Sequence, residues 1–144
     1  MTISQKGIDL IKNFEGFINH IYTCPAGKPT IGYGHVVLIS DSFPVKISEK
    51  EANKLLYIDV KKFENLVYEQ VKVPLTQEQF DALVCFAFNT GCIGKTMLKR
   101  LAAQNYKACA EEFDKWVFAT VQGKKVKLSG LVKRRKAEKE LFLS

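Results

Sequence analysis

Three side chains near the N-terminus have types and spacing that suit hydrolytic chemistry. Glu15, Cys24 and Thr30 offer a carboxylic acid, a thiol and a hydroxyl, separated by eight and then five residues. A turn-forming run, Pro25-Ala-Gly-Lys-Pro29, lies between the last two. An acid on one wall of a cleft, facing a thiol and a hydroxyl on the other, would suit the cleavage of a glycosidic bond.

The segment of about 4–15 is expected to form a helix that ends at Glu15. Ser4 can cap its start, and Gly16 suits the left-handed residue that commonly follows a helix. Apolar residues recur inside it at helical spacing, at Ile8, Ile11 and Phe14. The partial negative charge of a helix C-terminus favours the protonated form of an acid that is shielded from water. We therefore interpret Glu15 as a candidate general acid.

Cys24 and Thr30 are candidates for the second catalytic function, holding or activating a water on the opposite face of the sugar. A neutral thiol is a poor general base, so Cys24 must either act as a thiolate or help only to position the water. The sequence leaves these two possibilities open.

Patterning along the remaining chain predicts a small sheet followed by helices. Short β-type segments at 21–23 and 30–33 indicate a hairpin, with a third strand near 36–38. Two capping boxes, Ser48 to Glu51 and Thr76 to Gln79, begin a long helix to about 69 and a core helix ending before Gly91. The later pattern predicts helices at about 95–103 and 106–117, a basic loop or short ribbon at 123–128, and a last helix from 129.

The last helix carries charged residues where its apolar face is expected. On a helical wheel Arg134 and Glu138 fall between Leu131 and Leu141, and Arg135 lies at the edge. An unpaired buried charge is expensive, so these residues require partners. Either Arg134 and Glu138 pair with each other at i, i+4, or the arginine holds the acid of an active site.

Composition and cysteine usage favour a single soluble globular domain spanning 1–144. Hydrophobic residues make up 47% and charged residues 26% of the chain. The N-terminus lacks the apolar run of a signal peptide or membrane anchor, so we expect synthesis in the cytoplasm. Four cysteines without metal-ligand spacing predict no metal site, and Cys85 and Cys109 are expected in the core.

Positive charge is concentrated near the C-terminus. Residues 121–144 hold eight Lys or Arg and two Glu, a balance of +6 within the total of +7. Such a segment is either a solvated face or attracts an anionic partner, such as nucleic acid, a membrane surface or a cell-wall polymer. No nucleic-acid-binding motif is present, so nucleic acid is not expected as a partner.

The ordered motifs together resemble the phage-type lysozymes, or endolysins, of glycoside hydrolase family 24. That family shows Glu, eight residues, Asp or Cys, five residues, Thr, and a Thr-Ile-Gly-x-Gly-His run, which this chain matches from Glu15 to His35. The resemblance continues through Ile11-Lys-Asn-Phe-Glu-Gly-Phe17, Gln79-Phe-Asp-Ala-Leu-Val, Phe88-Asn-Thr-Gly91 and Gly130-Leu-Val-Lys-Arg-Arg-Lys-Ala-Glu138.

The resemblance implies an α+β, lysozyme-like fold with a cleft between two lobes. A small hairpin lobe is expected at about 16–47, and a larger helical lobe at about 72–144, packed with helix 4–15. A connecting helix at about 49–69 joins them. The implied reaction is hydrolysis of the β-1,4 bond between N-acetylmuramic acid and N-acetylglucosamine, with inversion and without a cofactor, causing bacterial lysis.

The resemblance also assigns roles to residues. It implies that Glu15 is the general acid, that Cys24 fills a position commonly held by aspartate, and that Thr30 orients water. Arg134 and Tyr33 are expected to support the acid or bind substrate. The remaining motif residues are expected to be structural supports: Gly32, Gly34 and His35.

Two other functions fit parts of the sequence. Cys24 with His35 could form the nucleophile and base of a peptidoglycan peptidase or amidase. The basic C-terminus could belong to a non-catalytic wall-binding module. The lysozyme interpretation predicts a monomer that acts on peptidoglycan without stable membrane insertion, reaching the cell wall through a separate holin.

Overall fold

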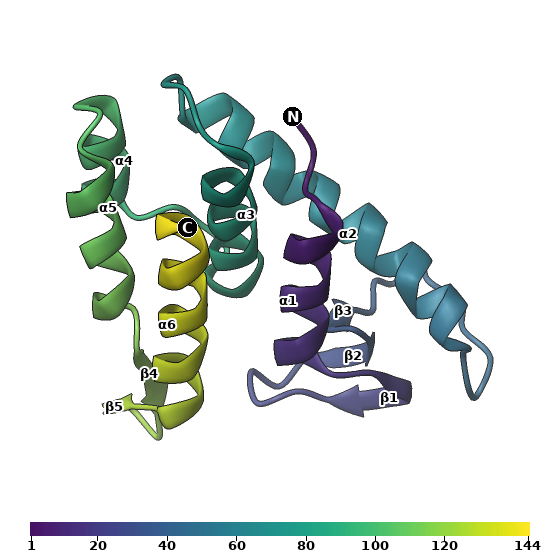
Figure 1. Cartoon of the computed structure of the whole chain (residues 1–144). Helices are drawn as coiled ribbons and strands as arrows, with labels where there is room; N and C mark the ends of the chain where they lie inside the picture. Colours follow the sequence, from purple (N-terminus) through teal and green to yellow (C-terminus); the bar gives the residue numbers. More distant parts are fainter. The chain divides into compact units, whose positions relative to one another are not determined.

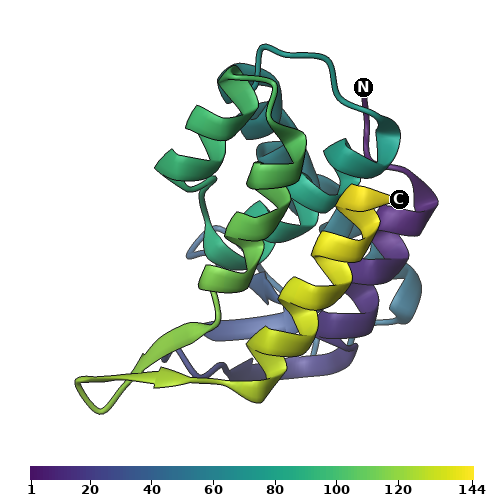
Figure 2. The same ribbon diagram turned by 60° about the vertical axis from the view of Figure 1, so that its left-hand side comes forward.

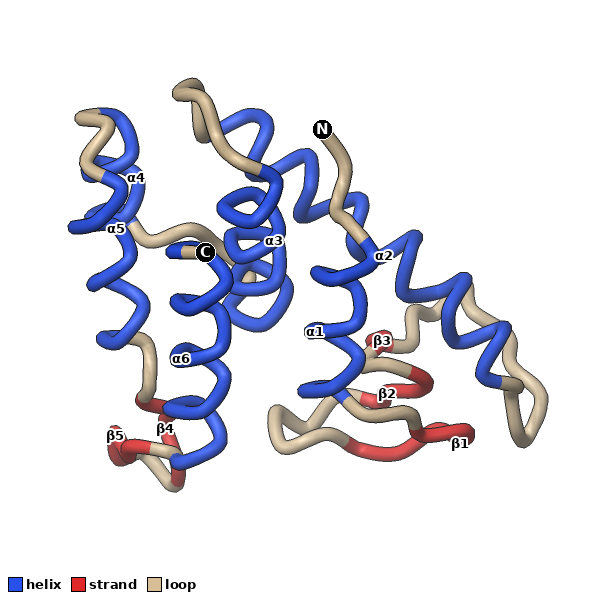
Figure 3. Tube along the Cα trace, in the orientation of Figure 1, coloured by secondary structure: helices blue, strands red, loops and turns tan.

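The computed structural model describes residues 1–144 and confirms a mixed fold of helices and small antiparallel sheets. Figure 3 shows the helices and strands along the chain. The chain forms two compact units, Asp9–Lys62 and a second one made of Met1–Ile8 with Phe63–Ser144. The division passes through the first and second helices, so each of these contributes residues to both units. No helix has both the length and the apolar character needed to cross a bilayer.

The unit of residues 9–62 is built around a three-stranded antiparallel sheet. Helix α1 (Gln5–Glu15) ends at Gly16, whose φ of 70° is the left-handed conformation expected there. The sheet has the order β1-β2-β3. Its strands are β1 (Ile18–Thr23), β2 (Pro29–Gly32) and β3 (His35–Val36). Helix α2 (Glu49–Gln70) begins at the predicted box, where Glu51 N–H donates to Ser48 Oγ at 3.1 Å.

The third strand forms at His35–Val36, whereas the pattern predicted about 36–38. Val37 N–H still donates to Pro29 O at 2.9 Å, but the next residue leaves the ladder. Leu38 N–H donates to the carboxylate of Asp41 at 2.8 Å, and Asp41 N–H donates back to Leu38 O at 2.9 Å. A local side-chain acceptor therefore replaces the strand partner and turns the chain.

The unit of residues 1–8 and 63–144 is helical, and its core lies along α3 (Gln77–Thr90). Thr76 and Gln79 form the predicted capping box, and Gly91 ends the helix with φ of 83°. Helix α6 (Ser129–Leu143) packs beside α3, as Figure 1 shows. Helices α4 (Lys95–Ala102) and α5 (Tyr106–Glu112) complete the bundle.

The N-terminal residues are fastened to this helical unit. Ile3 N–H donates to Glu64 Oε2 at 2.7 Å, and Ser4 N–H donates to Asp81 Oδ1 at 2.9 Å. The Ser4 hydroxyl donates to the other Asp81 oxygen and accepts a long bond from Gly7 N–H, at 3.4 Å. The predicted cap of α1 therefore also links it to α3.

The helix predicted at 106–117 is shorter than expected. It ends at Glu112 and continues as the 3₁₀ helix η1 (Phe113–Lys115). The chain then forms an antiparallel pair, β4 (Phe118–Val121) and β5 (Lys124–Lys127), which extends from the helices in Figure 2. We call residues 118–127 the basic ribbon. The sequence predicted only its second half, because Phe118–Val121 was not identified as a strand.

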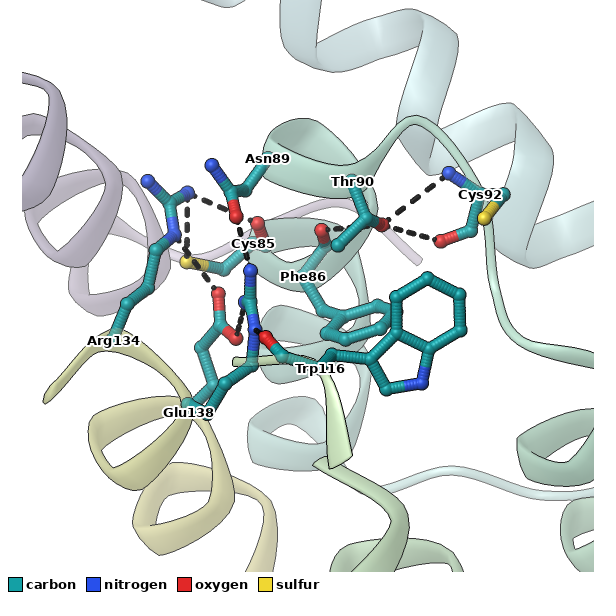
Figure 4. Close-up of polar contacts among 9 residues, drawn as sticks. Cys85, Phe86, Asn89, Thr90, Cys92, Trp116, Arg134 and Glu138 are labelled. Atoms are coloured by element: carbon teal, nitrogen blue, oxygen red, sulfur yellow. Dashed lines mark hydrogen bonds and ion pairs between the residues drawn. The ribbon is translucent and has the colours of Figure 1, made fainter. Parts of the chain in front are cut away.

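Two arginines and a glutamate of α6 form a buried charge cluster, shown in part in Figure 4. Arg134 Nε donates to Glu138 Oε2 at 3.1 Å, which confirms the predicted i, i+4 pair, and its Nη2 donates to Cys85 O at 3.1 Å. Arg135 also pairs with Glu138 and donates to Asn89 Oδ1 and, at 2.8 Å, to Trp116 O. Arg135 is only 1% exposed, although the wheel placed it at the edge of the apolar face.

Replacing Glu138 with Gln should destabilise the protein strongly. The change leaves two buried guanidinium groups without their shared carboxylate, and breaking a buried pair costs about 3–5 kcal/mol. Urea unfolding of the variant measures this loss. The matched control is Glu140→Gln, since Glu140 lies on the same helix and is exposed. Equal stability of the two variants would contradict the importance of the cluster.

Candidate active site

Glu15, the last residue of α1, lies directly against the Gly-Tyr-Gly turn that follows β2. A Cβ atom placed on Gly34 would lie 2.7 Å from Glu15 Oε1 and 3.3 Å from its Cδ. Gly34 also has φ of 73°, which side chains rarely adopt. Position 34 therefore needs glycine both for its backbone and for the space that the carboxylate occupies.

Cys24 sits in the tight turn between β1 and β2. Cys24 N–H donates to Lys28 O at 2.9 Å, and Gly27 N–H donates to Cys24 O at 2.8 Å. The backbone of Lys28, and then the hydroxyl of Thr30, lower the pKa of the Cys24 thiol below its ordinary value. This environment favours the thiolate, the state that a charged catalytic role requires.

Thr30 is buried in β2 beside that sulfur. Its hydroxyl donates to Lys28 O at 3.0 Å when it is not donating to the thiolate. Because a hydroxyl has one proton, these two bonds are alternatives.

Tyr22 is a member of this group that the sequence analysis did not identify. It pairs directly with Thr30 across the β1–β2 ladder, so the two side chains share a face of the hairpin. Burial, the charge of Glu15 and the charge of Cys24, in that order, raise the pKa of Tyr22. The charges of both candidate catalytic groups therefore act on the Tyr22 hydroxyl. The sequence could have indicated this, because residues two apart on a strand, such as Tyr22 and Cys24, point to the same face.

Gly32 and Tyr33 fasten the sheet to α2. A Cβ on Gly32 would lie 3.2 Å from the Cβ of Ala52, so strand and helix approach closely there. The Tyr33 hydroxyl donates to Glu49 Oε1 at 2.7 Å. Burial and this glutamate raise the pKa of Tyr33 to about 12. Tyr33 is 5% exposed, so its predicted contribution to substrate binding or acid support stays a prediction.

His35 is held between two carboxylates. Its Nδ1 lies 2.8 Å from Asp59 Oδ2 on α2, and its Nε2 lies 3.0 Å from Asp41 Oδ2 in the loop after β3. The hydrogen bond to Asp59 and, beyond it, that to Asp41 outweigh burial and raise the pKa of His35 to about 9. His35 is therefore charged at neutral pH, and both ring nitrogens donate.

This protonation state weakens the interpretation of Cys24 and His35 as a peptidase pair. A general base needs a free lone pair near neutral pH. The two aspartates occupy both nitrogens of His35 and keep the ring protonated. The geometry instead supports the predicted structural role of His35.

Arg134 belongs to the other compact unit, where Glu138 and Cys85 contact its guanidinium group. It is 4% exposed, as the position on the apolar face predicted. Its expected role beside the catalytic acid stays a prediction. Glu15, Cys24 and Thr30, by contrast, all lie within the unit of residues 9–62.

Comparison with known families identifies one family whose pattern spans most of the chain. The family described as phage lysozyme matches residues 12–138. The chain belongs to the phage lysozyme family. The endolysin of Acyrthosiphon pisum secondary endosymbiont phage 1 is 43% identical over 100% of this chain and 99% of its own length. The chain spans about half the length of the Bacillus phage endolysins that it also matches.

Solved structures of related proteins superpose closely on this chain. An endolysin from Escherichia coli O157:H7 phage FAHEc1 has a TM-score of 0.91 at 41% identity, covering 100% of this chain and 94% of its own. The muramidase domain of SpmX from Asticaccaulis excentricus has a TM-score of 0.86 at 36% identity, covering 99% and 98%. The lysozyme-like fold expected from the sequence is thereby confirmed.

The ion pairs of His35 should make the stability of this phage lysozyme depend on pH. Because the pKa of His35 rises from 6.5 to about 9 on folding, its contribution is complete below pH 6.5 and is lost as pH rises through 9. His35→Gln should remove that dependence and cost about 1–2 kcal/mol at pH 6, after allowing for screening at the partly exposed aspartates.

The measurement is the free energy of unfolding at a series of pH values from about 6 to about 10, which covers the range over which the shift acts. His20→Gln is the matched control, since His20 is exposed and its Nδ1 lies 3.0 Å from Oδ1 of the neighbouring residue Asn19. If wild type and His35→Gln share one pH slope, the double ion pair does not stabilise the fold.

Proposed function

We propose that this member of the phage lysozyme family hydrolyses peptidoglycan at the β-1,4 bond between N-acetylmuramic acid and N-acetylglucosamine, with inversion. One observation carries the proposal. After burial, the charges of Glu15 and Cys24 raise the pKa of the Tyr22 hydroxyl, which supports an acid and a sulfur of lowered pKa acting on one substrate. A glycosidase needs such a pair of groups.

Glu15 is the general acid in this proposal. Its carboxyl group would protonate the glycosidic oxygen as the bond to the anomeric carbon breaks, so that the leaving sugar departs as an alcohol. The close packing against Gly34 supports this role, because it restricts where the carboxylate can lie. A fixed acid avoids the entropic cost of orienting itself during the reaction.

Cys24 and Thr30 act on the attacking water. A Cys24 thiolate would accept a proton from the attacking water as the new C–O bond forms, while the Thr30 hydroxyl orients that water toward the face of the sugar opposite the leaving group. The lowered pKa of Cys24 supports the thiolate. Water attack opposite the leaving group inverts the anomeric carbon. Arg134 is proposed to support Glu15.

The substrate class follows from the relatives as well as from the site. The similar proteins are described as endolysins, and the SpmX domain as a muramidase. We propose the bacterial cell wall as the place of action. We also propose that the protein works as a monomer and reaches the wall through a separate holin.

Glu15→Gln should lower the rate of glycan cleavage by about 10²–10⁴-fold, because the amide keeps the shape of the side chain but cannot donate the proton. Muropeptide analysis measures the new reducing ends. Glu69→Gln is the matched control, since Glu69 lies in the last turn of a helix but is exposed. Substantial residual cleavage by Glu15→Gln would remove it from the role of acid, and new amino groups as the product would indicate an amidase.

The pair Cys24→Asp and Cys24→Ser tests the charge at position 24. Asp should keep activity, whereas Ser, which is neutral, should lose roughly 10²-fold. Because a carboxylate has a much lower pKa than a thiol, Asp should also move the acidic limb of the pH–rate profile to lower pH. Equal activity of the two variants, with unshifted profiles, would contradict a charged role.

A further inference from the structure

The basic ribbon and the start of α6 carry positively charged side chains and no negatively charged ones. Between Asp114 and Glu138 the chain has no Asp or Glu. Arg134 and Arg135 in this stretch are buried against Glu138. The positive charge that reaches the surface is therefore carried by exposed lysines, namely Lys124, Lys125, Lys127, Lys133 and Lys136.

Apolar side chains lie among these lysines and are exposed as well. Phe118 is 44%, Val121 45%, Val126 38% and Val132 37% exposed. The strand register places Phe118 opposite Lys127, and Val121 opposite Lys124. Since successive residues alternate between faces, each face of the ribbon combines apolar and cationic side chains. Lys125 Nζ also lies 4.7 Å from the centre of the Phe118 ring.

The helical core holds the ribbon at its base. Leu128 N–H donates to Val117 O at 3.0 Å, closing the two strands, and Arg135 Nε donates to Trp116 O at 2.8 Å. The Trp116 ring packs edge-on against Phe86, with centroids 5.3 Å apart. Figure 4 shows this contact, and Figure 2 shows the ribbon extending beyond it. The exposed apolar residues are thus presented on an anchored element.

An open hollow of about 380 Å³ lies where β5 meets α6, lined by Lys127, Ser129, Val132 and Lys133. The surface of the hollow is mostly apolar, and two of the four side chains that line it end in an ammonium group and one in a hydroxyl. These are the groups that a phosphate attached to an acyl chain would contact, because ammonium and hydroxyl groups donate to phosphate while the valine contacts hydrocarbon.

We propose that the basic ribbon and the first turns of α6 dock on the surface of a membrane containing anionic phospholipid. Lysines near such a surface each contribute about 1 kcal/mol, and apolar side chains gain by entering the interface. A hydrated polyanion, such as a wall polymer or nucleic acid, would attract the lysines but leave the valines exposed to water. The mixed faces therefore favour the lipid surface. This surface function goes beyond glycan hydrolysis and does not depend on it.

The test measures binding to vesicles of phosphatidylethanolamine with or without phosphatidylglycerol. Trp116 is the only tryptophan and lies at the base of the ribbon, so its emission reports binding. We expect a blue shift with the anionic vesicles alone, reversed by salt. The variant Lys124→Gln, Lys125→Gln, Lys127→Gln should bind roughly 100-fold more weakly.

The matched control is Lys50→Gln, Lys54→Gln, Lys61→Gln, which removes the same charge from exposed positions on α2. It should bind like wild type. A second variant, Val121→Ser with Val126→Ser, keeps every charge and should bind roughly tenfold more weakly. Urea unfolding of each variant checks that it is folded.

Three results would overturn the proposal. Wild type could fail to bind anionic vesicles. The ribbon and α2 lysine variants could also bind equally, which would assign binding to net charge alone. Alternatively the valine variant could bind unchanged while a soluble polyanion competes fully, which would make the ribbon a site for a hydrated polymer. Since the vesicles contain no glycan, none of these results bears on the catalytic roles of Glu15 and Cys24.

Discussion

Two arginines on one turn of α6 share a single buried glutamate, and the helical unit is arranged to satisfy all three. Taking such charges out of water costs several kcal/mol per ion, so the cluster is stable only if each donor has an acceptor. Those acceptors come from Glu138, from Cys85 O on α3 and from Trp116 O ahead of the ribbon. The requirement to pair these charges therefore fixes the rotation of α6 against α3 and the point from which the ribbon leaves.

In the unit of residues 9–62, a second set of polar contacts holds the small sheet against α2. A sheet of three short strands is too small to be stable by itself. His35 joins the sheet to Asp59 in the middle of α2, and Tyr33 joins the sheet to Glu49 at the start of the same helix. Two residues of one short motif, separated by Gly34, thus hold the strands against a helix. The turn bearing Glu15's neighbour Gly34 lies between these two attachments, which gives the candidate acid a rigid surface to pack against.

Local chemistry explains what could be predicted from the sequence. The two capping boxes and Gly16 act within a few residues, so their positions were predicted correctly. The pair of Arg134 and Glu138 was one of two predicted alternatives, and helical spacing alone brings these residues together.

Predictions failed where a distant group decides the outcome. The burial of Arg135 depends on Trp116 O and Asn89, which no helical wheel includes. The strand at Phe118–Val121 exists because Lys124–Lys127 pairs with it, since its own side chains bury little. Tyr22 joins the candidate site through its position across from Thr30, and this requires the register of the hairpin. The spacing of Glu15, Cys24 and Thr30 identified the candidate site itself, whose catalytic roles stay predictions.

The absent side chain of Gly34 also carries information beyond this protein. The two glycines of the Gly-Tyr-Gly turn are constrained by different neighbours: Gly32 by the backbone and Cβ of Ala52, and Gly34 by the carboxylate of Glu15. A larger residue at the first position would disturb the packing of strand on helix, whereas one at the second would collide with the acid. In a genome survey, a related sequence that keeps the first glycine but has lost the second would thus be expected to keep the packing of strand on helix, while the turn is strained and the acid displaced. This pattern would help to recognise lysozyme folds that have been recruited to purposes other than hydrolysis.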